Sequence, residues 1–130
     1  MLPSILIVDD NQDACELFQE LLEMQGYTVR AAYTGQQALD LMARGTSSLF
    51  LLDLNLPDIH GTALAPQLRA RAQAQGVDRP VVIAITGMAY SHSDPEMDVF
   101  DHLLVKPVDF AQFDRLLEQC VATLQGSTSS

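Results

Sequence analysis

The sequence is short of positive charge. Its 130 residues contain seven Lys and Arg residues against 17 Asp and Glu residues, and Lys106 is the single lysine. The formal net charge is −10 at pH 7. Nucleic acids and anionic membrane surfaces are bound through clustered Lys and Arg side chains, so we expect no direct binding to either. A DNA-binding role would belong to another chain.

Long apolar runs and cysteines are also scarce. No apolar stretch approaches the roughly 20 residues of a membrane span, and residues 1–4 do not place a basic region ahead of an apolar run, as a secretory signal would. We therefore expect a cytoplasmic protein without membrane insertion. Cys15 and Cys120, the two cysteines, are expected to be free thiols, because reducing compartments disfavour disulfides.

Length and composition fit one folded domain. A hydrophobic fraction of 48% with 18% charged residues is typical of a soluble globular protein. A chain of this length can bury roughly two-thirds of the surface that its unfolded form exposes. We expect this domain over residues 1–124, followed by a disordered, serine-rich tail over residues 125–130.

Short apolar runs alternate with helical patterns along the chain. Runs without polar alternation are typical of strands buried on both faces of a parallel sheet, and residues 27–32 indicate a less buried strand nearer an edge. This alternation predicts an α/β fold with a doubly wound, five-stranded parallel sheet. In the third helix, Pro66 lacks a backbone donor, so we expect the regular helix to begin at or just before Pro66.

Four of the apolar runs are followed directly by a reactive polar residue. In doubly wound folds, sites lie beyond the carboxyl ends of the strands, so we expect these residues to meet. Asp9 and Asp10 follow residues 5–8, Asp53 follows residues 49–52, Thr86 follows residues 81–85, and Lys106 follows residues 103–105.

Three carboxylates in one pocket would repel one another. Two unit charges 4 Å apart repel by about 4 kcal/mol at an effective dielectric constant of about 20. Mg²⁺ would relieve this repulsion, since it takes carboxylate and carbonyl oxygens, and Lys106 supplies a second positive charge. Flanked by both, Asp53 can act as a nucleophile toward a phosphoryl group and form an aspartyl phosphate. The hydroxyl of Thr86 can hydrogen-bond a phosphoryl oxygen.

Four motifs, in order along the chain, resemble those of response-regulator receiver domains of two-component signalling. They are ILIVDDN at 5–11, LLDLNLPDIHG at 51–61, ITG at 85–87 and VKPV at 105–108. The resemblance covers about residues 4–124 and is closest to receivers of hybrid histidine kinases and their free-standing relatives. It implies a flavodoxin-like sheet with the strand order 2-1-3-4-5.

The resemblance also implies a function. Asp53 would be the phosphoacceptor of a phosphorelay, receiving the phosphoryl group from a histidine kinase or a histidine phosphotransfer protein. The chain would then signal to a downstream effector protein or domain through a changed surface. Such a protein catalyses its own phosphorylation and dephosphorylation and is not a turnover enzyme.

Further roles follow from the resemblance. Mg²⁺ would be bound by Asp10, Asp53 and the backbone carbonyl of Asn55, with Asp9 acting through water. Lys106 would pair with Asp53 before phosphorylation and with a phosphoryl oxygen afterwards. Thr86 would move toward the phosphate. A cis peptide bond between Lys106 and the following proline is also implied.

The sequence departs from the family pattern between residues 88 and 103. Most receivers carry an aromatic residue three positions before the lysine, and here that position is Leu103. Tyr90 or Phe100 would have to replace this aromatic switch. The segment before it carries a proline after a capping pattern. We therefore expect the fourth helix of the family, which would lie within residues 88–102, to be short or irregular.

Two other functions are compatible with parts of this pattern. A haloacid-dehalogenase-type phosphatase also uses Asp, Thr or Ser, Lys and Mg²⁺, but it needs an acid two residues after the nucleophile, where Asn55 stands. A receiver-like docking module that is not phosphorylated would not need Asp9, Asp10, Asp53, Thr86 and Lys106 together. His60, His92 and His102 match no metal-binding spacing, and we expect them in loops or on the surface.

Overall fold

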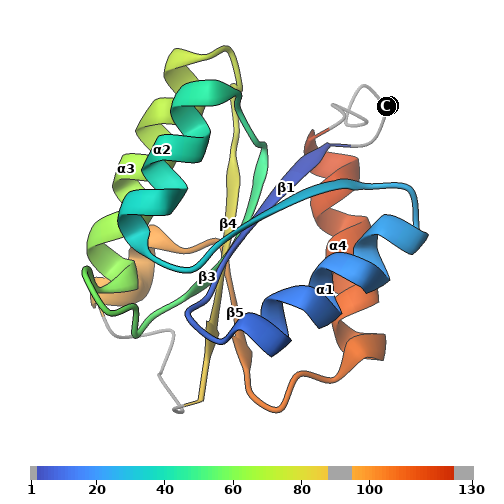
Figure 1. Cartoon of the computed structure of the whole chain (residues 1–130). Helices are drawn as coiled ribbons and strands as arrows, with labels where there is room; N and C mark the ends of the chain where they lie inside the picture. Colours follow the sequence, from blue (N-terminus) through green and yellow to red (C-terminus); the bar gives the residue numbers. More distant parts are fainter. Residues whose placement is uncertain (1–2, 88–94, 125–130) are drawn as a thin grey trace.

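The computed structural model describes residues 3–87 and 95–124 of the chain, which form a five-stranded parallel sheet between two layers of helices (Figure 1). The strand order is β2-β1-β3-β4-β5, as predicted. The strands are β1 (Ser4–Val8), β2 (Thr28–Ala32), β3 (Leu49–Asp53), β4 (Val81–Thr86) and β5 (His102–Val105). The helices are α1 (Gln12–Met24), α2 (Gly35–Arg44), α3 (Gly61–Ala74), the 3-10 helix η1 (Pro95–Val99) and α4 (Phe110–Leu124).

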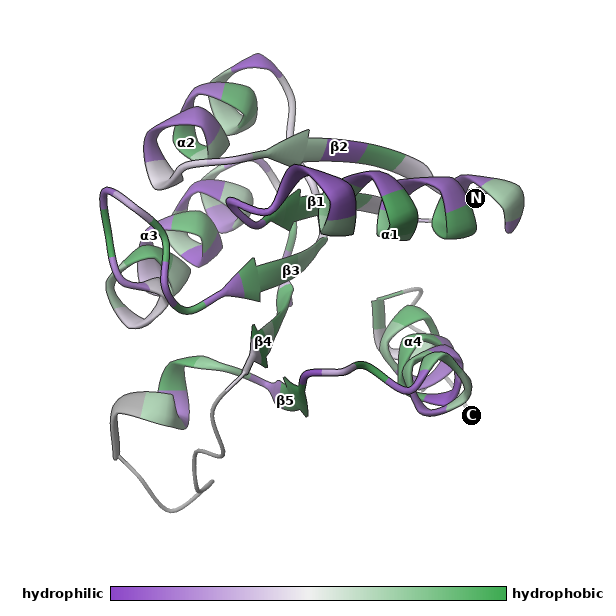
Figure 2. Cartoon of the chain, turned by 60° about the horizontal axis from the view of Figure 1, so that its bottom comes forward, coloured by the Kyte–Doolittle hydropathy of each residue, from purple (hydrophilic) through white to green (hydrophobic). Residues whose placement is uncertain are grey.

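The two faces of the sheet carry separate hydrophobic cores. Helices α1 and α4 cover one face, and α2 and α3 cover the other (Figure 1). Successive strand residues alternate between these cores: Ile5 and Ile7 pack with α1 and α4, whereas Leu6 and Val8 pack with α2 and α3. The central strands β1, β3 and β4 are buried on both faces, which explains why they are almost continuously hydrophobic, whereas the edge strands β2 and β5 are partly exposed and carry hydrophilic residues (Figure 2).

Polar side chains fix where the helices begin. Asn11, Thr34 and Asp109 each accept a hydrogen bond from a backbone N–H in the first turn of α1, α2 and α4, respectively. Such caps satisfy N–H groups that have no partner within the helix. The turn after α1 contains Gly26 with φ of 99°, a conformation that glycine adopts without steric cost.

The start of α3 differs from the prediction. The helix begins at Gly61 and contains Pro66 in its interior, so the expected start near Pro66 was wrong. The N–H of Gly61 donates to the carbonyl of Leu54 at 2.8 Å, and the side chain of His60 caps the helix. Leu64 is fully buried in the core. These contacts hold the first turn, and Pro66 in the following turn removes only one backbone donor.

The segment before β5 contains the short, irregular helix that was predicted. In the described residues it is the single 3-10 helix η1. It ends at an anchor in which Arg69 of α3 donates to the carbonyls of Pro80 and Val99, at 2.8 and 2.7 Å, and pairs with Asp101 at 3.2 Å. The carboxylate of Asp101 also accepts the N–H of Val82. This anchor joins α3, β4 and the start of β5.

The residues proposed to replace the missing aromatic are only partly described. Leu103 packs with Phe100 against a small core of Leu54, Ala84 and Met97. Tyr90 lies outside the described residues, as does the predicted tail over residues 125–130. None of the described helices is long and apolar enough to cross a membrane. Both cysteines are free, as expected, and buried.

Candidate functional site

Three carboxylates converge at the carboxyl edge of the sheet. Asp9 and Asp10 follow β1, and Asp53 ends the neighbouring strand β3. One oxygen from each lies within 4.8 Å of the others. Asp9 and Asp53 are buried, whereas Asp10 is exposed. The predicted acidic cluster is therefore formed, with one side open to solvent.

Lys106 brings the single ammonium group to this cluster. Its Nζ lies 3.5 Å from Asp9 Oδ2 and 3.7 Å from Asp53 Oδ2. The peptide bond between Lys106 and Pro107 is cis, as the resemblance implied. One ammonium facing three carboxylates leaves the cluster with an excess of negative charge.

Backbone groups orient the two buried carboxylates. The N–H of Asn11 donates to Asp9 at 2.9 Å, and the N–H of Asn55 donates to Asp53 at 3.2 Å. Burial raises the pKa of Asp9 above its ordinary value; the Asn11 hydrogen bond opposes this shift and the charge of Asp53 adds to it. The two hydrogen bonds therefore fix the orientation of both buried carboxylates.

Thr86 and Asn55 complete the predicted set. Thr86 ends β4 beside Asp53 on β3 and is fully buried. Its carbonyl accepts the N–H of Lys106 at 2.7 Å, which ties the ends of β4 and β5 together. Asn55 is exposed and opens the loop that follows Asp53. All six predicted residues therefore lie at the carboxyl edge of the sheet.

The donor set fits a hard divalent cation. Carboxylate oxygens are the ligands that Mg²⁺ prefers, and an exposed side leaves room for the waters it retains. Among the described residues, Asp9, Asp10 and Asp53 are the single group of three His, Cys, Asp or Glu side chains close enough to share an ion. His60 is an exposed helix cap and His102 lies on β5; His92 is outside the described residues.

Two contacts near the site were not predicted. The buried thiol of Cys15 donates to the backbone carbonyl of Asp9 at 3.2 Å. Asp58, in the loop after β3, accepts the backbone N–H groups of Gly35 and Gln36. The spacing of residues along the sequence predicts neither contact, because each contact depends on which segments lie side by side in the folded chain.

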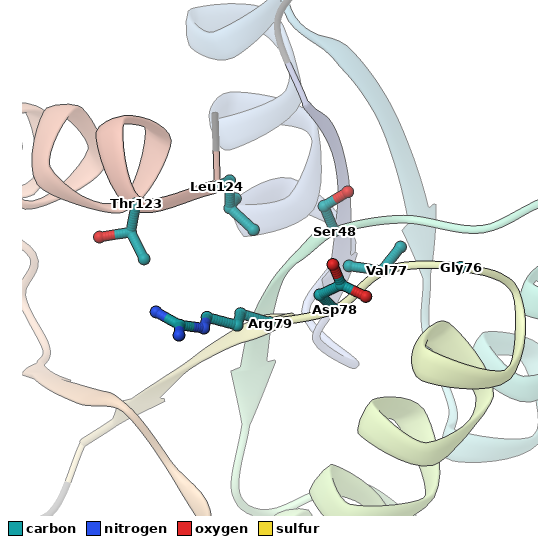
Figure 3. Close-up of a pocket in the computed structure, with 7 residues that line it drawn as sticks. All are labelled: Ser48, Gly76, Val77, Asp78, Arg79, Thr123 and Leu124. Atoms are coloured by element: carbon teal, nitrogen blue, oxygen red, sulfur yellow. The ribbon is translucent and has the colours of Figure 1, made fainter. Parts of the chain in front are cut away.

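One cavity of the described residues lies away from the carboxylates. It has a volume of about 500 Å³, and its lining includes Ser48, Asp78, Arg79 and Thr123 (Figure 3). Ser48 and Arg79 precede β3 and β4, so the cavity lies at the amino edge of the sheet. None of the predicted site residues lines this cavity. The candidate site is therefore the carboxylate cluster at the carboxyl edge of the sheet.

Known proteins share both the sequence pattern and the fold. The profile of the response regulator receiver domain matches residues 5–118. The polar-differentiation response regulator DivK of Brucella ovis is 33% identical over 89 residues, which cover 68% of this chain and 70% of DivK. The transcriptional regulatory protein ZraR of Escherichia coli (strain K12) is 29% identical over 122 residues, 91% of this chain. The match spans only 26% of the length of ZraR.

Solved structures agree with these matches. The CheY-like receiver domain from Methylobacillus flagellatus superposes with a TM-score of 0.76 at 32% identity, over 92% of this chain and 99% of that one. The response regulator TrrA from Thermotoga maritima, solved in complex with Mg²⁺-BeF, has a TM-score of 0.76 at 28% identity. That match covers 90% of this chain and 97% of TrrA.

Proposed function

This chain belongs to the response regulator receiver domain family, and from that premise we propose that it is a phosphoacceptor switch of a two-component phosphorelay. Asp53 would take a phosphoryl group from a phosphohistidine of a histidine kinase or a histidine phosphotransfer protein. The observation that carries the proposal is the position of Lys106, whose ammonium lies between Asp9 and Asp53 in a cluster of three carboxylates.

The proposed reaction is a transfer between two nucleophiles. A carboxylate oxygen of Asp53 attacks phosphorus and forms a C–O–P linkage as the N–P bond of the phosphohistidine breaks. The imidazole leaves with the bonding electron pair and is protonated. Because Asn55 donates to the other oxygen, Asp53 Oδ1, the carboxylate is held in one orientation for this attack.

Lys106 and Thr86 would act on the phosphoryl oxygens. Before transfer, the ammonium of Lys106 faces Asp53 at 3.7 Å. Afterwards it can pair with a phosphoryl oxygen, since the new group is roughly dianionic. The buried hydroxyl of Thr86 can donate a hydrogen bond to the same group, and its movement toward the phosphate would begin the change of surface.

Magnesium belongs to this proposal. Asp10, Asp53 and the backbone carbonyl of Asn55 would hold the ion, with Asp9 acting through a bound water. The ion, when bound, offsets negative charge on the carboxylates and on the transferring phosphoryl oxygens. The convergence of one oxygen each from Asp9, Asp10 and Asp53 within 4.8 Å supports this assignment, because carboxylate oxygens are the ligands that Mg²⁺ prefers.

The proposed role is signalling rather than turnover of a substrate. The chain would act in the cytoplasm and report its state to an effector protein or domain. Asn55 stands two residues after Asp53, where a phosphatase of the haloacid dehalogenase type needs an acid, and an amide cannot protonate a leaving group. A docking module without phosphorylation would not require the Lys106 contacts to both buried carboxylates.

The direct test is labelling by acetyl phosphate in the presence of Mg²⁺, followed by mass spectrometry of the intact protein. We expect one phosphoryl group on the native protein, labile to acid, base and hydroxylamine as an acyl phosphate is, and none on Asp53→Asn. Asp78→Asn, which changes an exposed aspartate at the opposite edge of the sheet, is the matched control and should label normally.

Equal labelling of native protein and Asp53→Asn would refute the assignment of Asp53. Repeated release of phosphate from monoesters, proportional to time and not limited to one turnover, would favour the phosphatase. Absence of labelling with intact folding would favour the docking module.

A further inference from the structure

We infer that Asp58 is a positioning residue for the phosphorylation site, because it fastens the loop after β3 to the N-terminus of α2. This loop runs from Leu54 to His60 and carries Asn55, whose carbonyl is the proposed Mg²⁺ ligand. The inference rests on the proposed function and adds to it a residue that touches neither the ion nor the phosphoryl group.

The carboxylate of Asp58 binds α2 with both oxygens. Oδ1 accepts the N–H of Gly35 at 2.8 Å, and Oδ2 accepts the N–H of Gln36 at 2.9 Å. These are the first two residues of α2, whose N–H groups have no partner within the helix. The helix dipole also favours a negative charge at this end. Hydrogen bonds from Gly35 and Gln36 accordingly lower the pKa of Asp58.

The packing around Gly35 supports the same contact. A methyl group added at Gly35 would overlap with Cγ2 of Ile59, the neighbour of Asp58. Ile59 is partly buried and packs against the core beneath α2 and α3. Gly35 therefore allows the loop to approach the helix closely enough for both hydrogen bonds to form.

The other end of the loop is closed by its own backbone. Asn55 and His60 form an isolated antiparallel bridge, and the N–H of Gly61 donates to the carbonyl of Leu54 at 2.8 Å. A side chain at Gly61 would crowd the backbone of Leu54, at 2.9 Å from its Cα. The loop is thus fixed at its stem by these bonds and at its tip by Asp58.

This arrangement makes the geometry at Asn55 depend on α2. Asn55 lies in the stem and also orients Asp53 through its N–H. Without the two hydrogen bonds to Asp58, the loop would lose its polar attachment to α2, and the Asn55 carbonyl would be held less firmly for the ion. Loss of partners that orient metal ligands typically weakens metal binding by about 10- to 100-fold.

The experiment is calorimetric titration of Mg²⁺ into the full chain. We expect Asp58→Ala to raise the dissociation constant for Mg²⁺ by roughly tenfold, and Asp58→Asn to raise it less, because an amide oxygen can still accept one N–H. Gly35→Ala, which displaces Ile59 from the other side, should weaken Mg²⁺ binding in the same direction. Faster amide exchange of residues 54–60 in metal-free Asp58→Ala is the second readout.

Thr34→Ala is the control for a merely structural role. Thr34 caps the same helix through Gln37 N but its side chain makes no hydrogen bond to the loop, so its loss destabilises α2 and should leave Mg²⁺ affinity unchanged. Equal weakening in Thr34→Ala and Asp58→Ala, or native affinity in Asp58→Ala, would overturn the inference. Native protein that binds Mg²⁺ but is not labelled by acetyl phosphate would overturn only the proposed function, and native protein that binds no Mg²⁺ would overturn both.

Discussion

Substituting Asp53 by Asn should stabilise the metal-free protein, although it removes the phosphoacceptor. The three carboxylate oxygens lie within 4.8 Å of one another, so each pair repels by about 3.5 kcal/mol at an effective dielectric constant of about 20. Asp53 takes part in two such pairs. Its attraction to Lys106 at 3.7 Å is about 4.5 kcal/mol on the same scale.

Repulsion therefore exceeds attraction at Asp53 by about 2.5 kcal/mol. Asp10 is exposed and the Lys106 side chain is 36% exposed, so solvent screening reduces the expected gain to about 1 kcal/mol. The asparagine can still accept the N–H of Asn55, so no buried donor is left unpaired.

The assay is urea unfolding followed by circular dichroism, with EDTA and with Mg²⁺. In EDTA we expect a higher free energy of unfolding for Asp53→Asn than for native protein, and a lower one for Lys106→Met, which removes only positive charge. Mg²⁺ at 100 times its dissociation constant should stabilise the native protein by about 2.7 kcal/mol and the Asn variant by less. A less stable Asp53→Asn protein in EDTA would refute the reasoning, because repulsion would then not dominate the site.

Three further predictions concern other parts of the molecule. Arg69→Ala should lower the free energy of unfolding by about 3 kcal/mol, since it removes two charge-assisted hydrogen bonds to carbonyls; Arg71→Ala, an exposed change on the same helix, should have little effect, and equal losses in urea unfolding would contradict this. Because hydrogen bonds from the first two residues of α2 lower the pKa of Asp58, its contribution to stability is present above about pH 5 and lost as pH falls through the folded-state pKa. The difference in urea midpoint between native protein and Asp58→Asn should therefore shrink between about pH 5 and pH 3, and a constant difference would exclude this linkage. Burial raises the pKa of Cys15 to about 12 and that of Cys120 to about 11, so at pH 8 iodoacetamide should modify the folded protein far more slowly than the urea-unfolded chain; similar rates, measured by mass spectrometry, would show that the thiols are accessible.

The sheet and the position of the site could be predicted from the sequence because both depend on local patterns. Continuous apolar runs identify strands buried on two faces, and parallel strands bring their carboxyl ends to one edge. Asp53 and Lys106 were therefore expected close together, and their separation of 3.7 Å agrees. The starts of α1 at Gln12 and of α4 at Phe110 also have a local cause, since the capping residues Asn11 and Asp109 act on the turn that follows them.

Contacts between segments that are distant in the sequence could not be predicted in this way. Asp58 reaches Gly35 only because α2 and α3 lie on the same face of the sheet, and Arg69 reaches Val99 only because η1 ends beside α3. The predicted start of α3 was wrong for a related reason. The local effect of Pro66 was correctly identified, but the backbone bond between Gly61 and Leu54 and the burial of Leu64 outweigh it.

Some basic side chains of this protein bind groups of the same chain, which limits the positive charge that is free at its surface. Three of the seven basic side chains have internal partners: Arg30 binds the carbonyls of Leu41 and Gly45 at the end of α2, Arg69 joins α3 to the segment before β5, and Lys106 faces the buried carboxylates. The remaining four, Arg44, Arg71, Arg79 and Arg115, are exposed.

The buried carboxylates of Asp9 and Asp53 are likewise withdrawn from the surface, so solvent and partners meet an acidic surface in keeping with the formal charge of −10. A protein with a basic face would be attracted to it over a distance of about 10 Å in 0.1 M salt. Its rate of association would fall as ionic strength rises, while an acidic protein would be repelled before any contact formed. Selection among partners therefore begins at long range, before the shape of the binding surface is met.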